Sequence, residues 1–232
     1  MSQTQIDLSS RDLRQRELVP PEKLAACHGL VIGVGAIGRQ VCLQLAATGM
    51  PEMTLVDHDI VDVVNLAPQG FMPQDLGNPK VDATAAWCRL LNPELQVHVH
   101  AERFRRSSTR TLDCFDQTDR QLAIFCCVDS IETRRLIWEA VRQRACAFFD
   151  GRMSAEVVRI LSSEKPAADQ GYAQTLFAPE QAFAGSCTAK STIYTASIAA
   201  GLMICQFTRW LRGLPLDRDI LLNLLASELT VS

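Results

Sequence analysis

The segment VIGVGAIGRQ occupies residues 31–40, and LVDHD follows at residues 55–59. The first segment is an apolar run that leads into three glycines spaced Gly33-x-Gly35-x-x-Gly38. In this pattern the first glycine permits a tight turn, the second lets the backbone approach a ligand, and the third lets a helix pack closely on the strand. The free N–H groups and dipole of the helix that follows favour a phosphate. The pattern therefore predicts a nucleotide site, although a glycine turn that serves packing alone has the same spacing.

An acidic residue, Asp57, ends the second predicted strand about 20 residues after the glycines, as in dinucleotide-binding folds. A carboxylate in this place can accept hydrogen bonds from both hydroxyls of a ribose. Residues 31–59 alone are compatible with NAD held for hydride transfer. They are equally compatible with ATP held so that its α-phosphate can be attacked.

The hydrophobic pattern outside this segment predicts an α/β chain with one βαβ unit at its start. A helix over 80–93 ends at Asn92-Pro93, and a long helix opens near Cys187 and closes on Gly213. Residues 162–186 show no period and are expected to form a loop, and residues 220–231 fit either an edge strand or a short helix. Strands are expected over 29–35, 53–57, 95–104, 122–129, 145–153 and 155–163, and further helices over 36–49 and 131–144.

Composition limits the function classes that remain. The chain has 232 residues, a formal charge of −3 and basic residues spread along its length, which argues against a nucleic-acid-coating protein. Its nine cysteines include no C-x-x-C pair, so no zinc site is expected. The polar N-terminus lacks the apolar core of a signal peptide, and the apolar run at 193–207 is too short to span a membrane. We expect a cytoplasmic protein that binds neither nucleic acid nor membrane.

The stretch DHDIVDVVNLAPQGFMPQDLGNPKVDA at 57–83 resembles the second signature of the ThiF/MoeB family, which includes the activating enzymes for ubiquitin and for sulfur carriers. Four further segments are similar to the family's motifs and appear in the same order along the chain. The residues that match the second signature are Asp57, Asp59, Val61, Asn65, Leu66, Gln69, Gly77, Pro79 and Lys80. The further segments are RDLRQ at 11–15, LNP at 91–93, VDSIETRR at 128–135 and CTAKSTIYTASIAAG at 187–201.

The resemblance implies a Rossmann-like ThiF/MoeB adenylation fold, with a mixed, mostly parallel sheet flanked by helices, over residues 23–232. It implies ATP-dependent adenylation of the C-terminal glycine carboxylate of a ubiquitin-like or sulfur-carrier β-grasp protein, with Mg²⁺. It also implies a homodimer in which an extended arm, residues 1–22, contributes to the partner's site. A ubiquitin-conjugating-type enzyme is a further partner that the resemblance allows.

The resemblance also implies roles for single residues. Lys80 would neutralise the triphosphate, and Asp129 would hold Mg²⁺ against it. Asn65, with Asp59 and Gln69 in the same signature, would contact the nucleotide, and Arg14 would reach the γ-phosphate in the partner subunit. Taken alone, each has an ordinary structural alternative: Lys80 a solvated lysine at a helix start, Asp129 a helix cap, and Arg14 a surface arginine.

Two positions decide between variants of this function. Cys187, which matches the family's reactive cysteine, is expected at a helix N-terminus, where a thiolate is stabilised and can attack an acyl-adenylate to form a thioester. Its alternative is a structural thiol. Pro68 stands where the family has an arginine that contacts the phosphates, so one charge-assisted hydrogen bond is missing. A nearby arginine that takes over the contact, or slow adenylation, would follow from this change.

Three rival functions remain open from the sequence. The first is adenylation of a non-protein or peptide substrate without a thioester. The second is a catalytically weak nucleotide-binding partner module, which the loss of the arginine at Pro68 motivates. The third is an NAD-dependent oxidoreductase, which Asp57 permits but which leaves the segment from Asn65 to Lys80 unexplained.

Overall fold

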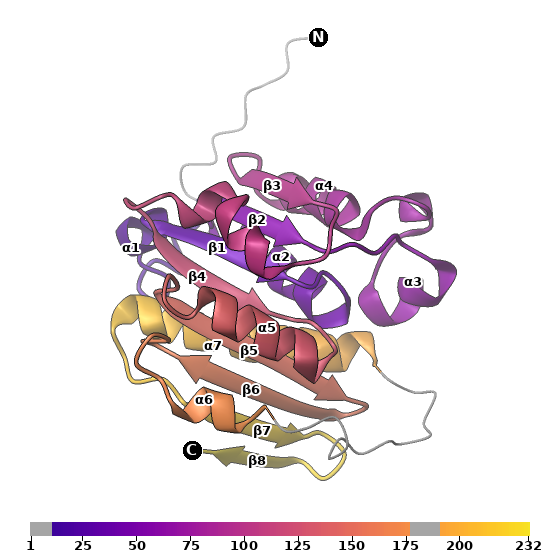
Figure 1. The fold of residues 1–232 in the computed structure, drawn as a ribbon. Helices are drawn as coiled ribbons and strands as arrows, with labels where there is room; N and C mark the ends of the chain where they lie inside the picture. The colour runs from indigo at the N-terminus through magenta and orange to yellow at the C-terminus, as the bar shows by residue number, and fades with distance from the viewer. Residues whose placement is uncertain (1–10, 177–190) are drawn as a thin grey trace.

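The computed structural model describes residues 11–176 and 191–232, which form one eight-stranded sheet with helices on both faces (Figure 1). The strand order is β3-β2-β1-β4-β5-β6-β7-β8. The strands are β1 (Cys27–Ile32), β2 (Glu52–Val56), β3 (Gln96–His100), β4 (Gln121–Cys126), β5 (Ala147–Ser154), β6 (Val157–Ser163), β7 (Asp219–Asn223) and β8 (Glu228–Val231).

The first five strands are parallel, and β1 pairs with both β2 and β4. The chain runs from β1 outward to β2 and β3, and then returns to place β4 on the other side of β1. The carboxyl ends of β1 and β4 therefore form the point where the strand order reverses, and open α/β sheets bind ligands at such points. Strands β6, β7 and β8 continue the sheet as antiparallel neighbours, which confirms the mixed sheet expected from the sequence.

The helices begin and end at residues whose local chemistry requires it. Helix α2 ends at Gly49, which adopts a left-handed φ of 95°, and α5 begins after Ser130, whose side chain accepts a hydrogen bond from the Thr133 N–H. Helix α4 stops at Asn92, because a residue before proline avoids the helical region. The helices are α1 (Pro21–Ala25), α2 (Ala36–Thr48), α3 (Val63–Gln69), α4 (Lys80–Leu91), α5 (Ile131–Val141), α6 (Gly171–Gln174) and α7 (Ile193–Arg212). Three short 3-10 turns are η1 (Pro73–Asp75), η2 (Arg106–Arg110) and η3 (Asp113–Phe115).

Two hydrophobic clusters hold helices to opposite faces of the sheet (Figure 1). On one face α2 and α7 pack together over the centre of the sheet, where the rings of Phe125 and Phe207 meet edge to face at 5.5 Å. On the other face α5 presents Trp138, whose ring lies 5.1 Å from that of Phe148 on β5. Since both faces of the central strands are covered, β1 is buried along its whole length, as its unbroken apolar sequence predicts.

The C-terminal third differs from the sequence expectation in three places. Helix α7 begins at Ile193, whereas the sequence predicts a start near Cys187. The side chain of Thr192 caps the helix by accepting the Thr195 N–H. The expected loop over 162–186 contains the short helix α6 in its described part. Residues 220–231, left open as strand or helix, contribute to the antiparallel pair of β7 and β8. Among the described residues, neither α7 nor another helix is long and apolar enough to cross a membrane.

The described part of the N-terminal arm, residues 11–22, contacts its own subunit; the contribution of an arm over 1–22 to a partner's site stays a prediction. Arg11 donates to the Asn92 side chain and to the Leu91 carbonyl at the end of α4. Gln15 donates to the Thr48 carbonyl at the end of α2 over 2.9 Å, and Val19 is buried. These contacts hold the segment at the end of the sheet opposite to the glycine turn (Figure 1).

Candidate functional site

The glycine turn between β1 and α2 forms the floor of the candidate site. Gly33 has a φ of +87°, and a Cβ atom there would lie 2.8 Å from the backbone of Cys127. A Cβ atom on Gly38 would lie 1.8 Å from the Gly33 carbonyl oxygen. On Gly35 the nearest atom to such a Cβ is Gln69 Oε1, at 3.9 Å. The outer two glycines are thus required by backbone packing, whereas Gly35 leaves open space over the turn.

This difference predicts opposite results for two matched substitutions. Gly38→Ala is expected to lower the free energy of unfolding by about 2 kcal/mol or more, because the backbone cannot move aside without breaking the strand–helix contact. Gly35→Ala is expected to leave stability within about 0.5 kcal/mol of the wild type, since its Cβ makes only an ordinary contact with Gln69 Oε1, but to weaken Mg-ATP binding. Urea unfolding and calorimetry measure the two quantities. Equal stability losses in both variants would contradict the assignment of Gly35 to a ligand.

Asp57, at the end of β2, joins that strand to the glycine turn. Its Oδ2 accepts the Val34 N–H at 2.6 Å, and its Oδ1 accepts the Asp59 N–H at 2.8 Å. Each carboxylate oxygen can accept a second hydrogen bond, so contact with a ribose stays compatible with this geometry. In the structure, Asp57 also fixes the turn, a role that the sequence pattern did not predict.

Lys80 lies at the first position of α4 with its ammonium beside Asp59. The Nζ–Oδ2 distance is 2.9 Å, and the side chain of Lys80 is 6% exposed against 48% for that of Asp59. Burial alone raises the pKa of Asp59, but the hydrogen bond and charge of Lys80 outweigh it and lower that pKa below its ordinary value. A buried lysine whose partner faces solvent can exchange this partner for an anionic ligand at small cost.

Carboxylate and imidazole groups gather at the same place. One ligand atom from each of Asp57, His58 and Asp59 lies within 4.8 Å of the others, so these residues are close enough to hold a metal ion. The sequence prediction placed Mg²⁺ at Asp129, which is exposed after the end of β4 and lies outside this group. Asp129 does not cap α5, because Ser130 does.

Helix α3 carries Asn65 and Gln69 along the edge of the site. Asn65 Oδ1 accepts the Asp62 N–H at 3.0 Å, so this side chain helps to cap α3. Gln69 Oε1 is buried and has no hydrogen-bond partner among the described residues, although it faces Gly35. Pro68 lies in the last turn of α3 and offers no charge. An unpaired acceptor of this kind is the feature that a bound ligand or an ordered water satisfies.

A buried ionic cluster, which sequence reasoning missed, adjoins the strand that leads to Asp129. Asp150 on β5 is fully buried and pairs with Arg134, with Arg152 at 2.7 Å, and with the Tyr172 hydroxyl at 2.9 Å. Arg134 also donates to the Val128 carbonyl, which precedes Asp129 in the chain. The cluster therefore holds the β4–α5 connection in place. Its signal in the sequence is an acid and an arginine inside the otherwise apolar strand AFFDGRM at 147–153.

The structure does not place two of the predicted site residues, Arg14 and Cys187, beside the glycine turn of the same subunit. Arg14 is exposed in the segment whose neighbours contact the C-terminal ends of α2 and α4, at the opposite end of the sheet. Cys187 lies outside the described residues.

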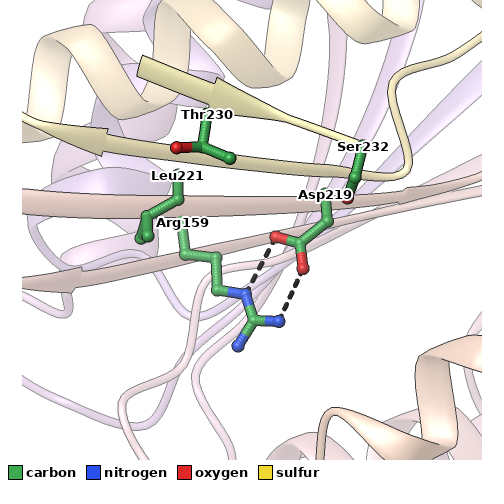
Figure 2. A pocket seen from close by; sticks show the side chains of 5 residues that line it. All are labelled: Arg159, Asp219, Leu221, Thr230 and Ser232. Atoms are coloured by element: carbon green, nitrogen blue, oxygen red, sulfur yellow. Dashed lines mark hydrogen bonds and ion pairs between the residues drawn. The ribbon is translucent and has the colours of Figure 1, made fainter. Parts of the chain in front are cut away.

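A shallow surface pocket lies elsewhere, on the antiparallel part of the sheet (Figure 2). Arg159 and Asp219 face each other across it, with a forked pair of contacts at 2.9 and 2.6 Å. Leu221, Thr230 and Ser232 complete its lining. The two charged side chains of this pocket satisfy each other, so we keep the residues around the glycine turn as the candidate site.

Comparison with known proteins gives a match over most of the chain. A model described as the ThiF family matches residues 9–227. The SAMP-activating enzyme E1 of Haloferax volcanii is 34% identical over 108 residues, which cover 45% of this chain and 40% of that protein. The ubiquitin-like modifier-activating enzyme 5 of Drosophila ananassae is 28% identical over 140 residues, which cover 55% of this chain and 34% of that protein. The chain thus spans well under half the length of these two relatives.

Solved structures show the same fold at low sequence identity. PaaA has a TM-score of 0.77 and 18% identity, with coverage of 100% of this chain and 85% of PaaA. Escherichia coli MccB has a TM-score of 0.73 and 16% identity, with coverage of 91% of this chain and 63% of MccB. These likenesses support the assigned topology.

Proposed function

The chain belongs to the ThiF family, and we propose on this basis that it is an ATP-dependent adenylyltransferase that activates the C-terminal glycine carboxylate of a ubiquitin-like β-grasp protein. Relatives named as activating enzymes for ubiquitin-like modifiers and for SAMP support this choice of substrate. The single observation that carries the proposal is the meeting of the open glycine turn, Asp57 and the buried Lys80 at the point where the strand order reverses.

The residues present fit a nucleoside triphosphate with its divalent cation. The space over Gly35 and the unpaired Oε1 of Gln69 lie where a ligand can approach the turn. Lys80 supplies a cation, and Asp57, which is hydrogen-bonded to the glycine turn, supplies a carboxylate for the ribose. Asp59 and Asn65 complete the contacts proposed for the nucleotide. Bound Mg²⁺, held by Asp129, would offset the charge of the phosphates.

The proposed reaction is a substitution at phosphorus. A carboxylate oxygen of the substrate attacks the α-phosphorus of ATP, the α–β anhydride bond breaks, and pyrophosphate leaves with the electron pair. All the reacting groups are anionic, so the contribution of the protein is to orient them and to offset their charge. Lys80 acts on the phosphate chain, and Asp57 orients the ribose.

We further propose that Cys187 takes over the acyl group as a thioester, with release of AMP. Tagged protein incubated with Mg-ATP in a lysate of its host is then expected to give an adduct on a non-reducing gel that thiol reagents remove. Cys187→Ala abolishes the adduct, whereas Cys205→Ala, which removes an exposed thiol of α7, leaves it intact. An adduct that survives in Cys187→Ala would contradict the thioester. Full pyrophosphate exchange without any adduct would favour adenylation of a substrate that is released.

The position of Arg14 leads us to propose a homodimer in which each arm completes the site of the other subunit. Arg14→Ala and Asp129→Ala are each expected to lack exchange activity alone. A mixture of the two recovers about a quarter of wild-type activity, because half of the dimers then contain one intact site of two. A mixture no more active than its separate components would show that Arg14 does not act across a dimer.

A further inference from the structure

Arg39, the fourth residue of α2, is a buried cation that lacks a hydrogen-bonded counter-ion among the described residues. Its residue exposure is 4%, and its Nε has no hydrogen-bond partner. Its side chain makes no hydrogen bond or ion pair with the residues at 11–176 and 191–232 that the structure describes. Leaving a buried charge unpaired costs several kcal/mol, so such groups in proteins are usually paired or serve a ligand.

The surroundings of Arg39 hold the guanidinium in place and compensate its charge only through an acid that is not hydrogen-bonded to it. Its Cζ atom lies 4.8 Å from the centre of the Phe71 ring, as in a cation–π contact. Burial lowers the pKa of Arg39 and the charge of Asp75 opposes this shift, but an arginine remains protonated. Asp75 accepts the Met72 N–H at 2.8 Å, and it acts on Arg39 through its charge and not through a hydrogen bond. The charge is therefore available to another anion.

Arg39 also lies on the side of α2 that faces the candidate site. Its N–H donates to the Gly35 carbonyl at 3.0 Å, which places it one turn after Gly35 on the same face of the helix. Its guanidinium packs on Phe71, which follows α3 in the chain, so the charge lies between α2 and the segment after α3. Gln69, two residues before Phe71, turns its unpaired Oε1 towards Gly35. An unpaired donor and an unpaired acceptor thus flank the start of α2.

We propose that Arg39 pairs with the phosphate chain of the bound nucleotide and supplies the guanidinium that α3 lacks at Pro68. The inference rests on the proposed function, since it assumes that a nucleoside triphosphate binds at the glycine turn. It adds a binding residue on α2, outside the signature at 57–83, and it explains why a charge is kept where apolar packing would be more stable. Arg39 is then a specificity determinant for phosphate over uncharged nucleosides.

The test compares Arg39→Met and Arg39→Lys with the wild type in the full chain. Calorimetry measures binding of Mg-ATP and of adenosine, and thermal unfolding measures stability. Arg89→Met is the matched control, because Arg89 is an exposed arginine of α4 that donates to the Val97 carbonyl. Methionine keeps the length of the apolar stem and removes only the charged head.

Arg39→Met is expected to weaken Mg-ATP binding by about 10- to 100-fold and to leave adenosine binding within about twofold. Its melting temperature stays the same or rises, and Arg39→Lys loses less affinity than Arg39→Met because it keeps the charge. If Arg39→Met binds Mg-ATP with wild-type affinity, the role proposed for Arg39 is wrong, and the proposed function is not affected. Equal losses for both ligands together with a lower melting temperature would show a structural role. Failure of the wild type to bind Mg-ATP would overturn the proposed function as well.

Discussion

Replacing Lys80 with methionine is expected to lower the rate of ATP–pyrophosphate exchange by about 10²- to 10³-fold while the protein stays folded. The ammonium of Lys80 is buried beside Asp59, close to the end of β2, where a phosphate chain would gain from its charge. Methionine keeps most of the apolar stem. The partner left behind, Asp59, has a side chain that is 48% exposed, so no buried unpaired charge is created.

Two controls separate the loss of chemistry from a loss of structure. Lys23→Met removes an exposed lysine of α1 and is expected to have wild-type activity. Thermal unfolding of Lys80→Met should fall close to that of the wild type. Exchange activity equal to that of Lys23→Met would show that Lys80 is only a lysine at a helix start.

The largest effect on stability is expected for Asp150→Ala, at about 3–5 kcal/mol. This substitution leaves Arg134, itself 4% exposed, and Arg152 without their shared carboxylate, and it removes the acceptor of the Tyr172 hydroxyl. Urea unfolding measures the change. The expected loss is large because the buried guanidinium of Arg134 and the mostly buried guanidinium of Arg152 lose their shared counter-ion.

Asp219→Ala is the matched control for this prediction. Asp219 also binds an arginine through both oxygens, but its side chain is 27% exposed and that of Arg159 is 36% exposed. A pair so open to solvent contributes about 0–1 kcal/mol. A loss in Asp150→Ala no larger than in Asp219→Ala would contradict the structural role of the buried cluster.

The sequence was sufficient for the parallel half of the fold, because its signals are local. The apolar run before Gly33 and the Gly49 stop define β1 and α2; β1 lies within three residues of its expected ends, and α2 lies within one residue of its expected ends. The proline after Asn92 ends α4 as expected. The family resemblance extended this prediction to the whole sheet, which the observed strand order confirms.

The features that escaped prediction depend on contacts between distant residues. Asp150 and Arg134 belong to different elements, and their pairing has no periodic signature in the chain. Arg39 occurs in an amphipathic helix, where a sequence pattern gives no reason to distinguish a solvated arginine from a buried one. The start of α7 was placed too early because Thr188, Ser191 and Thr192 are all good capping residues, and only tertiary packing selects among them.

The measurement that tests the central proposal most directly is ATP–pyrophosphate exchange by the purified wild-type protein, with each glycine-terminated β-grasp protein of its host in turn. We expect exchange with at least one of them that requires Mg²⁺ and the terminal glycine, and that is lost in Asp129→Ala. The proposal would be contradicted if no exchange occurred with any of these proteins while the chain bound NADH tightly and did not bind Mg-ATP. That result would favour an NAD-dependent oxidoreductase.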